Sequence, residues 1–204
     1  MDTMFAIFLV DDEPAIVKAM SRLLRTRDYD VRAFTSPQDF LANHDPVLPG
    51  CAIFDVSMPG LDGLELQEAM TAGGFVRPVI FMTGKGDIPT SVRAMKAGAI
   101  DFLTKPVSEQ EIFAAIARAE KQDTDARQVQ AERTSIQAKM ATLTPREQQV
   151  MAHVVAGRLN KQIAGDLGTV EKTIKVHRSR VMGKMGVRTV ADLVRLVGKA
   201  RLLG

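Results

Sequence analysis

Five short apolar runs, separated by stretches of helical character, organise the first half of this 204-residue chain. The runs are residues 5–10, 31–34, 52–55, 79–83 and 101–103. Continuous apolar runs of this length are typical of strands that are buried on both faces of a parallel sheet. Strands that alternate with helices favour a doubly wound α/β fold, in which helices cover both faces. The first half is therefore predicted to form a five-stranded parallel sheet of this class.

Local signals mark several of the intervening helices. Ser36 followed by Pro37 predicts an N-cap with proline at the first helical position. Ser108 and Glu111 form a capping box ahead of the next apolar stretch, and Gly98 ends the helix before the fifth run. These signals support the alternation of strands with helices.

Polar side chains stand at the ends of four of the five runs. Asp11 and Asp12 follow the first run, Asp55 ends the third, Thr83 ends the fourth and Lys105 follows the fifth. Strands of one polarity bring these ends to the same edge of a sheet, where open α/β folds bind ligands. An acidic pair at a single strand end is more often a solvated turn, but joint placement at four strand ends favours a site.

The chemistry of that edge indicates a metal and a phosphoryl group. Three carboxylates at one place would repel one another without a cation. Oxygen ligands suit Mg²⁺ better than zinc, and the sequence has no cluster of His and Cys. The hydroxyl of Thr83 and the ammonium of Lys105 would then face a phosphoryl group.

Charge divides the chain into two unlike parts. Residues 1–120 carry 11 basic and 17 acidic side chains, whereas residues 121–204 carry 16 basic and 7 acidic ones. Such asymmetry predicts two domains, one that binds cations and one that binds a polyanion. The apolar run at residues 5–10 is too short to span a membrane and lacks a basic leader, so no membrane association and a cytoplasmic location are expected.

Residues 121–141 contain neither Gly nor Pro and are rich in Ala, Gln and mixed charges. One interpretation is that the last helix of the first domain continues into a helical linker. The other is a solvated, partly frayed connector. The predicted organisation is a first domain at 1–120, a linker at 121–142 and a second domain at 143–204.

The second domain is predicted to be all-α, with four helices. Thr144 and Glu147 form a capping box, Asn160 starts the next helix, residues 171–185 form a third, and Thr189 starts a fourth that runs to residue 199.

A helix-turn-helix pattern lies within this domain. Ala164, Gly168 and Ile174 supply the small residue, the turn glycine and the apolar anchor that the motif needs, although any short helix pair can imitate the pattern. Residues 174, 177, 181 and 185 form an apolar stripe on the third helix, and the opposite face is cationic. A cationic helix face is often merely solvated. The 12 basic against 4 acidic residues of 141–204 favour nucleic acid instead.

Residues 4–120 resemble the receiver domain of two-component response regulators. The resemblance rests on Asp11-Asp12, on the stretch 55–59 continuing to Gly63, on Thr83, and on the stretches 96–99 and 102–106. It implies a flavodoxin-like sheet of order 2-1-3-4-5 and a Lys105–Pro106 bond that is often cis.

The same resemblance implies roles for the residues at the strand ends. Asp55 would be phosphorylated by a sensor histidine kinase, and Lys105 would grip a phosphoryl oxygen. Mg²⁺ would bind to Asp12 and Asp55 directly, to Asp11 directly or through water, and to the backbone carbonyl of Ser57. Thr83 and Phe102 would be the switch residues, moving on phosphorylation.

Residues 143–200 resemble the LuxR-type DNA-binding domain of FixJ/NarL regulators, through the stretches 143–147, 160–164 and 172–178 and through Gly157. The resemblance implies a four-helix domain whose third helix enters the major groove. Base-facing residues would be Lys175, Val176 and Ser179, phosphate contacts would be Lys161, Lys172 and Arg178, and the dimer contact on the last helix would be Leu193, Val194 and Val197. Val170 departs from the family, which usually caps the third helix with serine or threonine, and Thr169 is the alternative cap.

Together the two halves indicate a phosphorylation-controlled bacterial transcription regulator. It would promote only its own phosphoryl transfer and dephosphorylation, and would dimerise on phosphorylation. Its partners would be a sensor histidine kinase, double-stranded promoter DNA and, as a further candidate, RNA polymerase. Whether it activates or represses stays open.

Two other functions are compatible with parts of the sequence. One is a phosphatase with an aspartyl-phosphate nucleophile, although Ser57 occupies the position where such enzymes usually carry a second carboxylate. The other is a regulator whose first domain docks proteins without responding to phosphate.

Overall fold

The structure, a computed structural model, describes residues 4–84 and 88–202, and side chains to residue 199. The chain divides into two compact units, Met1–Ala126 and Arg127–Gly204. The division falls inside the segment that the sequence analysis assigns to a linker. Across the described residues, no helix combines the length and the apolar character needed to cross a membrane.

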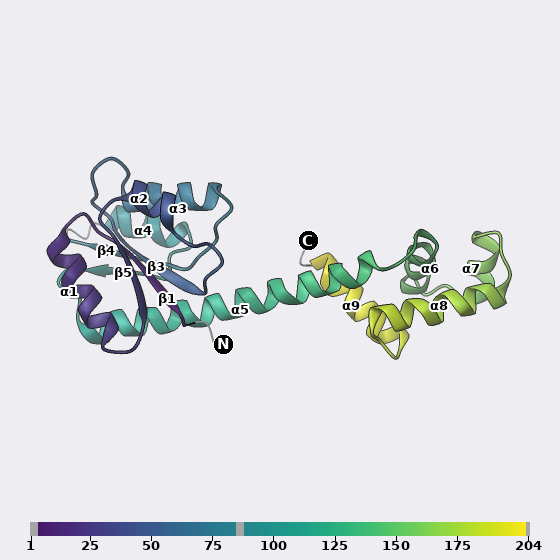
Figure 1. Cartoon of the computed structure of the whole chain (residues 1–204). Coiled ribbons are helices and arrows are strands. Elements are labelled where there is room, and N and C mark those ends of the chain that lie inside the picture. The colour runs from purple at the N-terminus through teal and green to yellow at the C-terminus, as the bar shows by residue number, and fades with distance from the viewer. Residues whose placement is uncertain (1–3, 85–87, 203–204) are drawn as a thin grey trace. The chain divides into compact units, whose positions relative to one another are not determined.

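The first unit is a five-stranded parallel sheet with helices between the strands (Figure 1). Its elements are β1 (Ala6–Val10), α1 (Pro14–Arg25), β2 (Asp30–Phe34), α2 (Pro37–Asn43), β3 (Gly50–Asp55), α3 (Gly63–Ala72), β4 (Val79–Thr83), α4 (Ile88–Lys96), β5 (Asp101–Thr104) and α5 (Glu109–Ala141). The strand order is β2-β1-β3-β4-β5. The predicted flavodoxin-like order and the five predicted strands are therefore confirmed.

Alternate residues of the sheet enter two separate cores. Phe8, Phe54 and Phe81 pack with α2, α3 and α4 on one face. Ile53 and Ile80 pack with α1 and with the first part of α5 on the other. Both faces are covered, so the central strands are buried throughout, as the continuous apolar runs predict.

One glycine holds α3 close to the end of β3. A Cβ atom at Gly63 would lie 2.4 Å from the backbone oxygen of Asp55. The N–H of Gly63 donates to the carbonyl of Val56 at 3.0 Å. Close backbone approach therefore requires glycine beside Asp55.

A buried hydrogen bond ties α5 to the start of β3. The carboxylate of Asp123 accepts from the N–H of Gly50 at 3.3 Å, and Asp123 is 5% exposed. From there α5 runs on without a break to Ala141. The interpretation of residues 121–141 as a continuing helix is thus confirmed over that of a frayed connector.

The second unit contains the end of α5 and four further helices, α6 (Pro145–Val155), α7 (Asn160–Asp166), α8 (Glu171–Met185) and α9 (Val190–Leu202). Ile174, Val181 and Met185 lie in its core, as the predicted stripe requires. His177, the remaining residue of that stripe, is half-buried.

The predicted helix caps form in both units. Ser36 accepts from the N–H of Asp39, and Thr144 forms a capping box with Glu147. At α8 the N-cap residue is Val170 and not Thr169, and it supplies no side-chain hydrogen bond. The helix nevertheless begins at Glu171, where the sequence predicts.

Candidate functional site

The four polar strand ends of the first unit lie at one edge of the sheet. Asp11 follows β1, Asp55 is the last residue of β3, Thr83 is the last of β4 and Lys105 follows β5. Because all five strands are parallel, these positions share the carboxyl edge.

Lys105 lies between two buried carboxylates. Its Nζ is 2.7 Å from Oδ2 of Asp11 and 2.6 Å from Oδ1 of Asp55. The exposed fractions of the three side chains are 16% for Lys105, 0% for Asp11 and 5% for Asp55. Glu13 Oε1 lies farther away, at 3.9 Å, and is mostly exposed. The predicted convergence of acidic side chains near the lysine is confirmed for Asp11 and Asp55.

Backbone groups fix the other oxygen of each carboxylate. The N–H of Ser57 donates to Oδ2 of Asp55 at 2.8 Å, and the N–H of Glu13 donates to Oδ1 of Asp11 at 2.9 Å. Lys105 is held in turn by its own N–H, which donates to the carbonyl of Thr83 at 2.7 Å. The Lys105–Pro106 peptide bond is cis, as the resemblance implies.

The ammonium of Lys105 is stabilised in its charged form. Burial acts to lower the pKa of Lys105, but hydrogen bonds to Asp11 and Asp55 outweigh it and raise the pKa above the ordinary lysine value. The pocket therefore holds a permanent cation against two carboxylates.

The donor set at this edge fits Mg²⁺ only in part. Two buried carboxylates and nearby backbone carbonyls are the oxygen ligands that Mg²⁺ accepts, with water in the remaining positions. Asp12 is half-buried and Ser57 is exposed. Within the part of the chain that the structure describes, no three acidic, His or Cys side chains are grouped so that they could hold a metal ion. Lys105 instead lies between Asp11 and Asp55.

The two predicted switch residues lie on the neighbouring strands β4 and β5. Thr83 is buried at the end of β4. Phe102, on β5, is half-buried and packs at the margin of the core, with its ring centroid 6.5 Å from that of Phe81.

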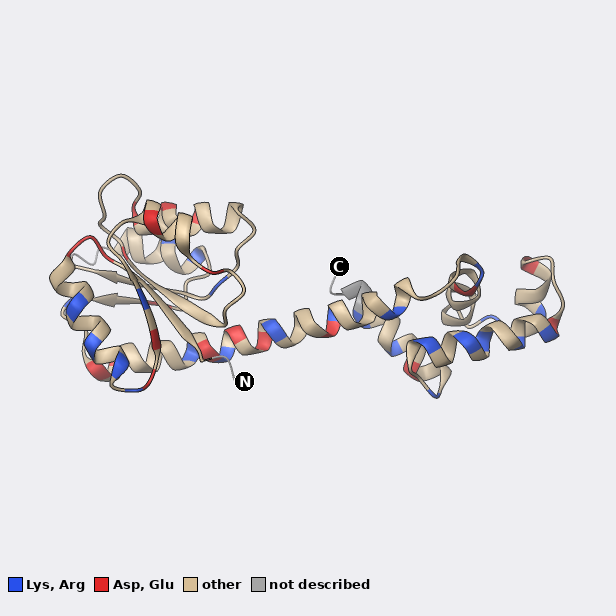
Figure 2. Cartoon of the chain, in the orientation of Figure 1, with Lys and Arg blue, Asp and Glu red and all other residues tan. Residues whose placement is uncertain are grey.

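In the second unit, α8 presents a basic face. Lys172, Lys175, Val176 and Ser179 are exposed, opposite the buried stripe. Lys and Arg recur along this helix (Figure 2). The arrangement exposes two cations, the valine methyl groups and a hydroxyl on one side of α8, as the helical spacing predicts.

The remaining predicted phosphate contacts lie beside this face. Lys161, in the first turn of α7, is exposed. Arg178 is half-buried, and its Nη1 donates to Oδ1 of Asn160 at 2.7 Å, which fixes its guanidinium between α7 and α8.

The three residues predicted to form the dimer contact on α9 differ in burial. Leu193 and Val197 are 0% and 5% exposed because they belong to the core of the second unit itself. Val194 is 41% exposed. Of these three residues, Val194 is the one whose side chain remains accessible to a second molecule.

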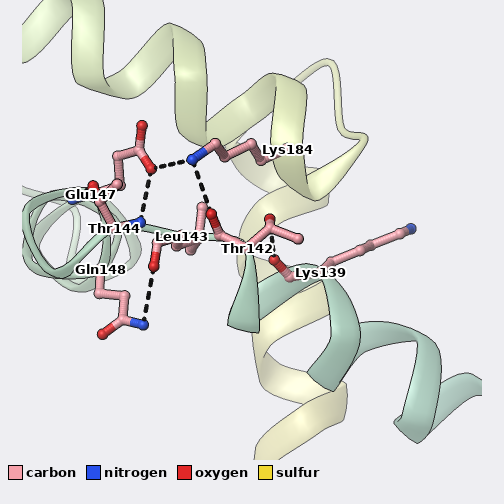
Figure 3. Close-up of polar contacts among 7 residues, drawn as sticks. All are labelled: Lys139, Thr142, Leu143, Thr144, Glu147, Gln148 and Lys184. Carbon is pink, nitrogen blue, oxygen red and sulfur yellow. Dashed lines mark hydrogen bonds and ion pairs between the residues drawn. The ribbon is translucent and has the colours of Figure 1, made fainter.

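An ion pair between a buried glutamate and a partly exposed lysine, which the sequence analysis missed, joins α6 to the end of α8 (Figure 3). Nζ of Lys184 lies 2.6 Å from Oε2 of Glu147 and donates to the carbonyl of Thr142 at 2.9 Å. Oε2 of Glu147 also accepts from the N–H of Thr144. The hydrogen bonds from Lys184 and Thr144 lower the pKa of Glu147 to about 2. No signal in the sequence pairs two residues so far apart.

Comparisons with known proteins agree with this division of the chain. Residues 7–117 match the family of response regulator receiver domains, and residues 141–197 match the luxR family of bacterial regulatory proteins. The chain is 40% identical over 203 residues to the transcriptional regulatory protein FixJ of Bradyrhizobium diazoefficiens, which covers 100% of this chain and 99% of that protein.

Two further similarities extend over nearly the whole chain. Nodulation protein W of the same bacterium is 40% identical over 190 residues, which is 93% of this chain and 84% of that protein. The structure of the response regulator StyR superposes with a TM-score of 0.88 at 42% identity, covering 96% of this chain and 99% of that one.

Proposed function

Because this chain belongs to the two-component response regulators, with a receiver domain and a LuxR-type DNA-binding domain, we propose that a sensor histidine kinase phosphorylates Asp55 and that this modification controls binding to promoter DNA. The observation that carries the proposal is Lys105, held between Asp11 and Asp55 at the carboxyl edge of the sheet. The chain is thus a transcription regulator.

Asp55 would act as the nucleophile. A carboxylate oxygen of Asp55 attacks the phosphorus of a phosphohistidine, an O–P bond forms, and the N–P bond breaks to return the histidine. Lys105 neutralises negative charge that develops on the phosphoryl oxygens, while the N–H of Ser57 orients the Asp55 carboxylate. Mg²⁺, held by Asp55 with Asp12, Asp11 and the Ser57 carbonyl, would supply further charge neutralisation. Slow hydrolysis would return the free carboxylate.

The pocket already holds an excess of negative charge, because one ammonium faces two buried carboxylates. A phosphoryl group on Asp55 would add more negative charge, so we expect the side chains around it to rearrange. Thr83 would turn its hydroxyl toward the phosphoryl group, and Phe102 would pack inward. The half-buried state of Phe102 supports this proposal, because the ring is not yet locked in the core.

In the DNA-binding domain, α8 would lie in the major groove. Lys175, Val176 and Ser179 would face bases, with lysine donating to guanine and the valine methyl groups meeting thymine. Lys161, Lys172 and Arg178 would contact phosphates. Exposure of the base-facing residues on the side opposite the core supports this placement.

Phosphorylation would favour a homodimer that binds two half-sites. Val194 is the residue on α9 that we propose for the contact between DNA-binding domains, since Leu193 and Val197 are occupied in the core. RNA polymerase is a further proposed partner. Because its proposed partners are a kinase and promoter DNA, we expect the protein to act in the bacterial cytoplasm.

The test combines labelling with DNA binding. Wild type and Asp55→Asn are incubated with a phosphorylated sensor kinase or acetyl phosphate in Mg²⁺, and acid-labile labelling and operator affinity are measured. We expect the variant to lose both the label and the gain in affinity. Labelling that persists would place the acceptor elsewhere. Equal affinity with and without phosphorylation would favour a domain that only docks proteins.

A further inference from the structure

Acidic residues are scarce in the DNA-binding domain, and three of the four in residues 141–204 interact with residues that are not proposed to contact DNA. Glu147 is buried and pairs with the partly exposed Lys184. Asp192 caps α9 through Thr189. Asp166 lies 3.7 Å from Nδ1 of His153. The fourth acid, Glu171, lies in the first turn of the helix proposed to read DNA.

Glu171 is paired with one of the proposed base-reading residues. Its Oε1 lies 3.6 Å from Nζ of Lys175, one helical turn further along, and the side chains are 48% and 66% exposed. An exposed pair at this spacing adds little to the stability of a helix. A carboxylate in the first turn also interacts favourably with the helix dipole. Neither effect requires the acid to be on a face that meets a polyanion.

On that face a carboxylate is costly unless DNA offers it a donor. Every phosphate that approaches repels Glu171, so the residue weakens binding to all sequences alike. In the major groove the amino group of cytosine is the donor that Glu and Asp accept from, and guanine O6 and N7 are acceptors for lysine. The 3.6 Å between the two charged atoms is close to the roughly 3.4 Å rise between stacked bases.

We propose that Glu171 is a specificity-determining residue, which accepts a hydrogen bond from a cytosine amino group while Lys175 donates to a neighbouring guanine. The inference rests on the proposed placement of α8 in the major groove. Glu171 thereby lowers affinity for most sequences and restores it where a cytosine lies opposite the carboxylate.

The experiment uses the full-length chain, phosphorylated with acetyl phosphate, and a duplex library randomised over the operator. Wild type, Glu171→Ala, Glu171→Gln and Lys175→Ala are compared by selection and sequencing, and affinities by anisotropy. Glu132→Ala is the matched control, since Glu132 forms an exposed ion pair with Lys199 at 3.0 Å on other helices of the same unit. Thermal melting checks that each variant is folded.

We expect Glu171→Ala to reduce the preference for cytosine at one position by roughly 5- to 150-fold and to strengthen binding to unrelated DNA. Glu171→Gln should shift that position toward adenine, because glutamine pairs with adenine N6 and N7. Glu132→Ala should leave every base preference unchanged.

The inference is overturned if both Glu171 variants bind all sequences more tightly and keep the wild-type preferences. If Lys175→Ala changes base preference in that case, α8 still reads DNA and only the role of Glu171 fails. If Lys175→Ala also changes nothing, the proposed placement of α8 fails with it.

Discussion

Replacing Lys105 by methionine removes the cation between two buried carboxylates, and the structure indicates a large loss of stability. Methionine keeps most of the side-chain volume, so the change is chiefly one of charge. In the wild type, one ammonium compensates Asp11 and Asp55, and after the substitution both carboxylates are left without it.

The magnitude follows from burial. Removing one partner of a buried ion pair costs about 3–5 kcal/mol, because the remaining charge stays desolvated. The backbone N–H groups of Glu13 and Ser57 still bind the carboxylates, so we expect a value near the lower end, about 3 kcal/mol. That is a large fraction of the 5–15 kcal/mol typical of a whole domain. Asp55→Asn should lower the stability of the receiver domain much less, since Lys105 then remains paired with Asp11.

Hydrogen exchange measured by mass spectrometry on the full-length chain can follow this loss. Peptides that cover β3 report the opening free energy of the receiver domain, independently of the DNA-binding domain. The measurement is made in EDTA and repeated in Mg²⁺. We expect the deficit of Lys105→Met to shrink in Mg²⁺, because a divalent cation then compensates the carboxylates. Lys96→Met, at an exposed lysine of α4, is the control.

Two results would contradict this reasoning. If Lys105→Met exchanges no faster than Lys96→Met in EDTA, the lysine does not compensate the carboxylates. If the double variant Lys105→Met/Asp55→Asn is less stable than Lys105→Met, uncompensated negative charge on the buried carboxylates is not the source of the loss.

Four further outcomes are expected. The lowered pKa of Glu147 means that the second unit loses stability as the pH falls from about 4.5 toward 2, and Lys184→Met should reduce this loss in circular dichroism titrations. Gly63→Ala should destabilise the receiver domain by about 1–3 kcal/mol and slow its labelling by acetyl phosphate, because the new Cβ would meet the Asp55 backbone. Leu193→Ala should cost about 2–5 kcal/mol in denaturant unfolding. Val194→Ala should change stability by under about 0.5 kcal/mol but weaken self-association in sedimentation.

The sequence predicts the parts of the fold that depend on local pattern. The strand order follows from the resemblance to receiver domains, and the meeting of Asp11, Asp55 and Lys105 follows from parallel strands, whose ends share an edge. Helix starts are predicted from capping residues that lie three positions apart in the sequence, such as Thr144 and Glu147. Cap signals connect neighbours in the chain, and the shared edge follows from strand polarity alone, so both can be predicted without coordinates.

Contacts between distant residues were not predictable in the same way. β3 begins at Gly50, before the run predicted at residues 52–55, because Gly50 pairs with Ala6 of β1. The Asp123 carboxylate, 73 residues later, accepts from the Gly50 N–H. Helical spacing places Leu193 and Val197 on one side of α9, but spacing alone does not reveal whether that side meets the core or a partner. The sequence places Lys105 at the same edge as the two acids, but only the structure shows that its ammonium contacts both carboxylates directly.

The continuous helix α5 determines where the two halves of this regulator can be separated. A fragment that starts at residue 143 would lack the Thr142 carbonyl, which binds Lys184, and Ile136, which is buried in the second unit. A fragment or a chimera joined between Ala126 and Arg127 keeps both, and keeps Asp123 on the receiver side. Exchange of input and output modules between relatives should therefore succeed at a junction inside a helix rather than at the turn that follows it.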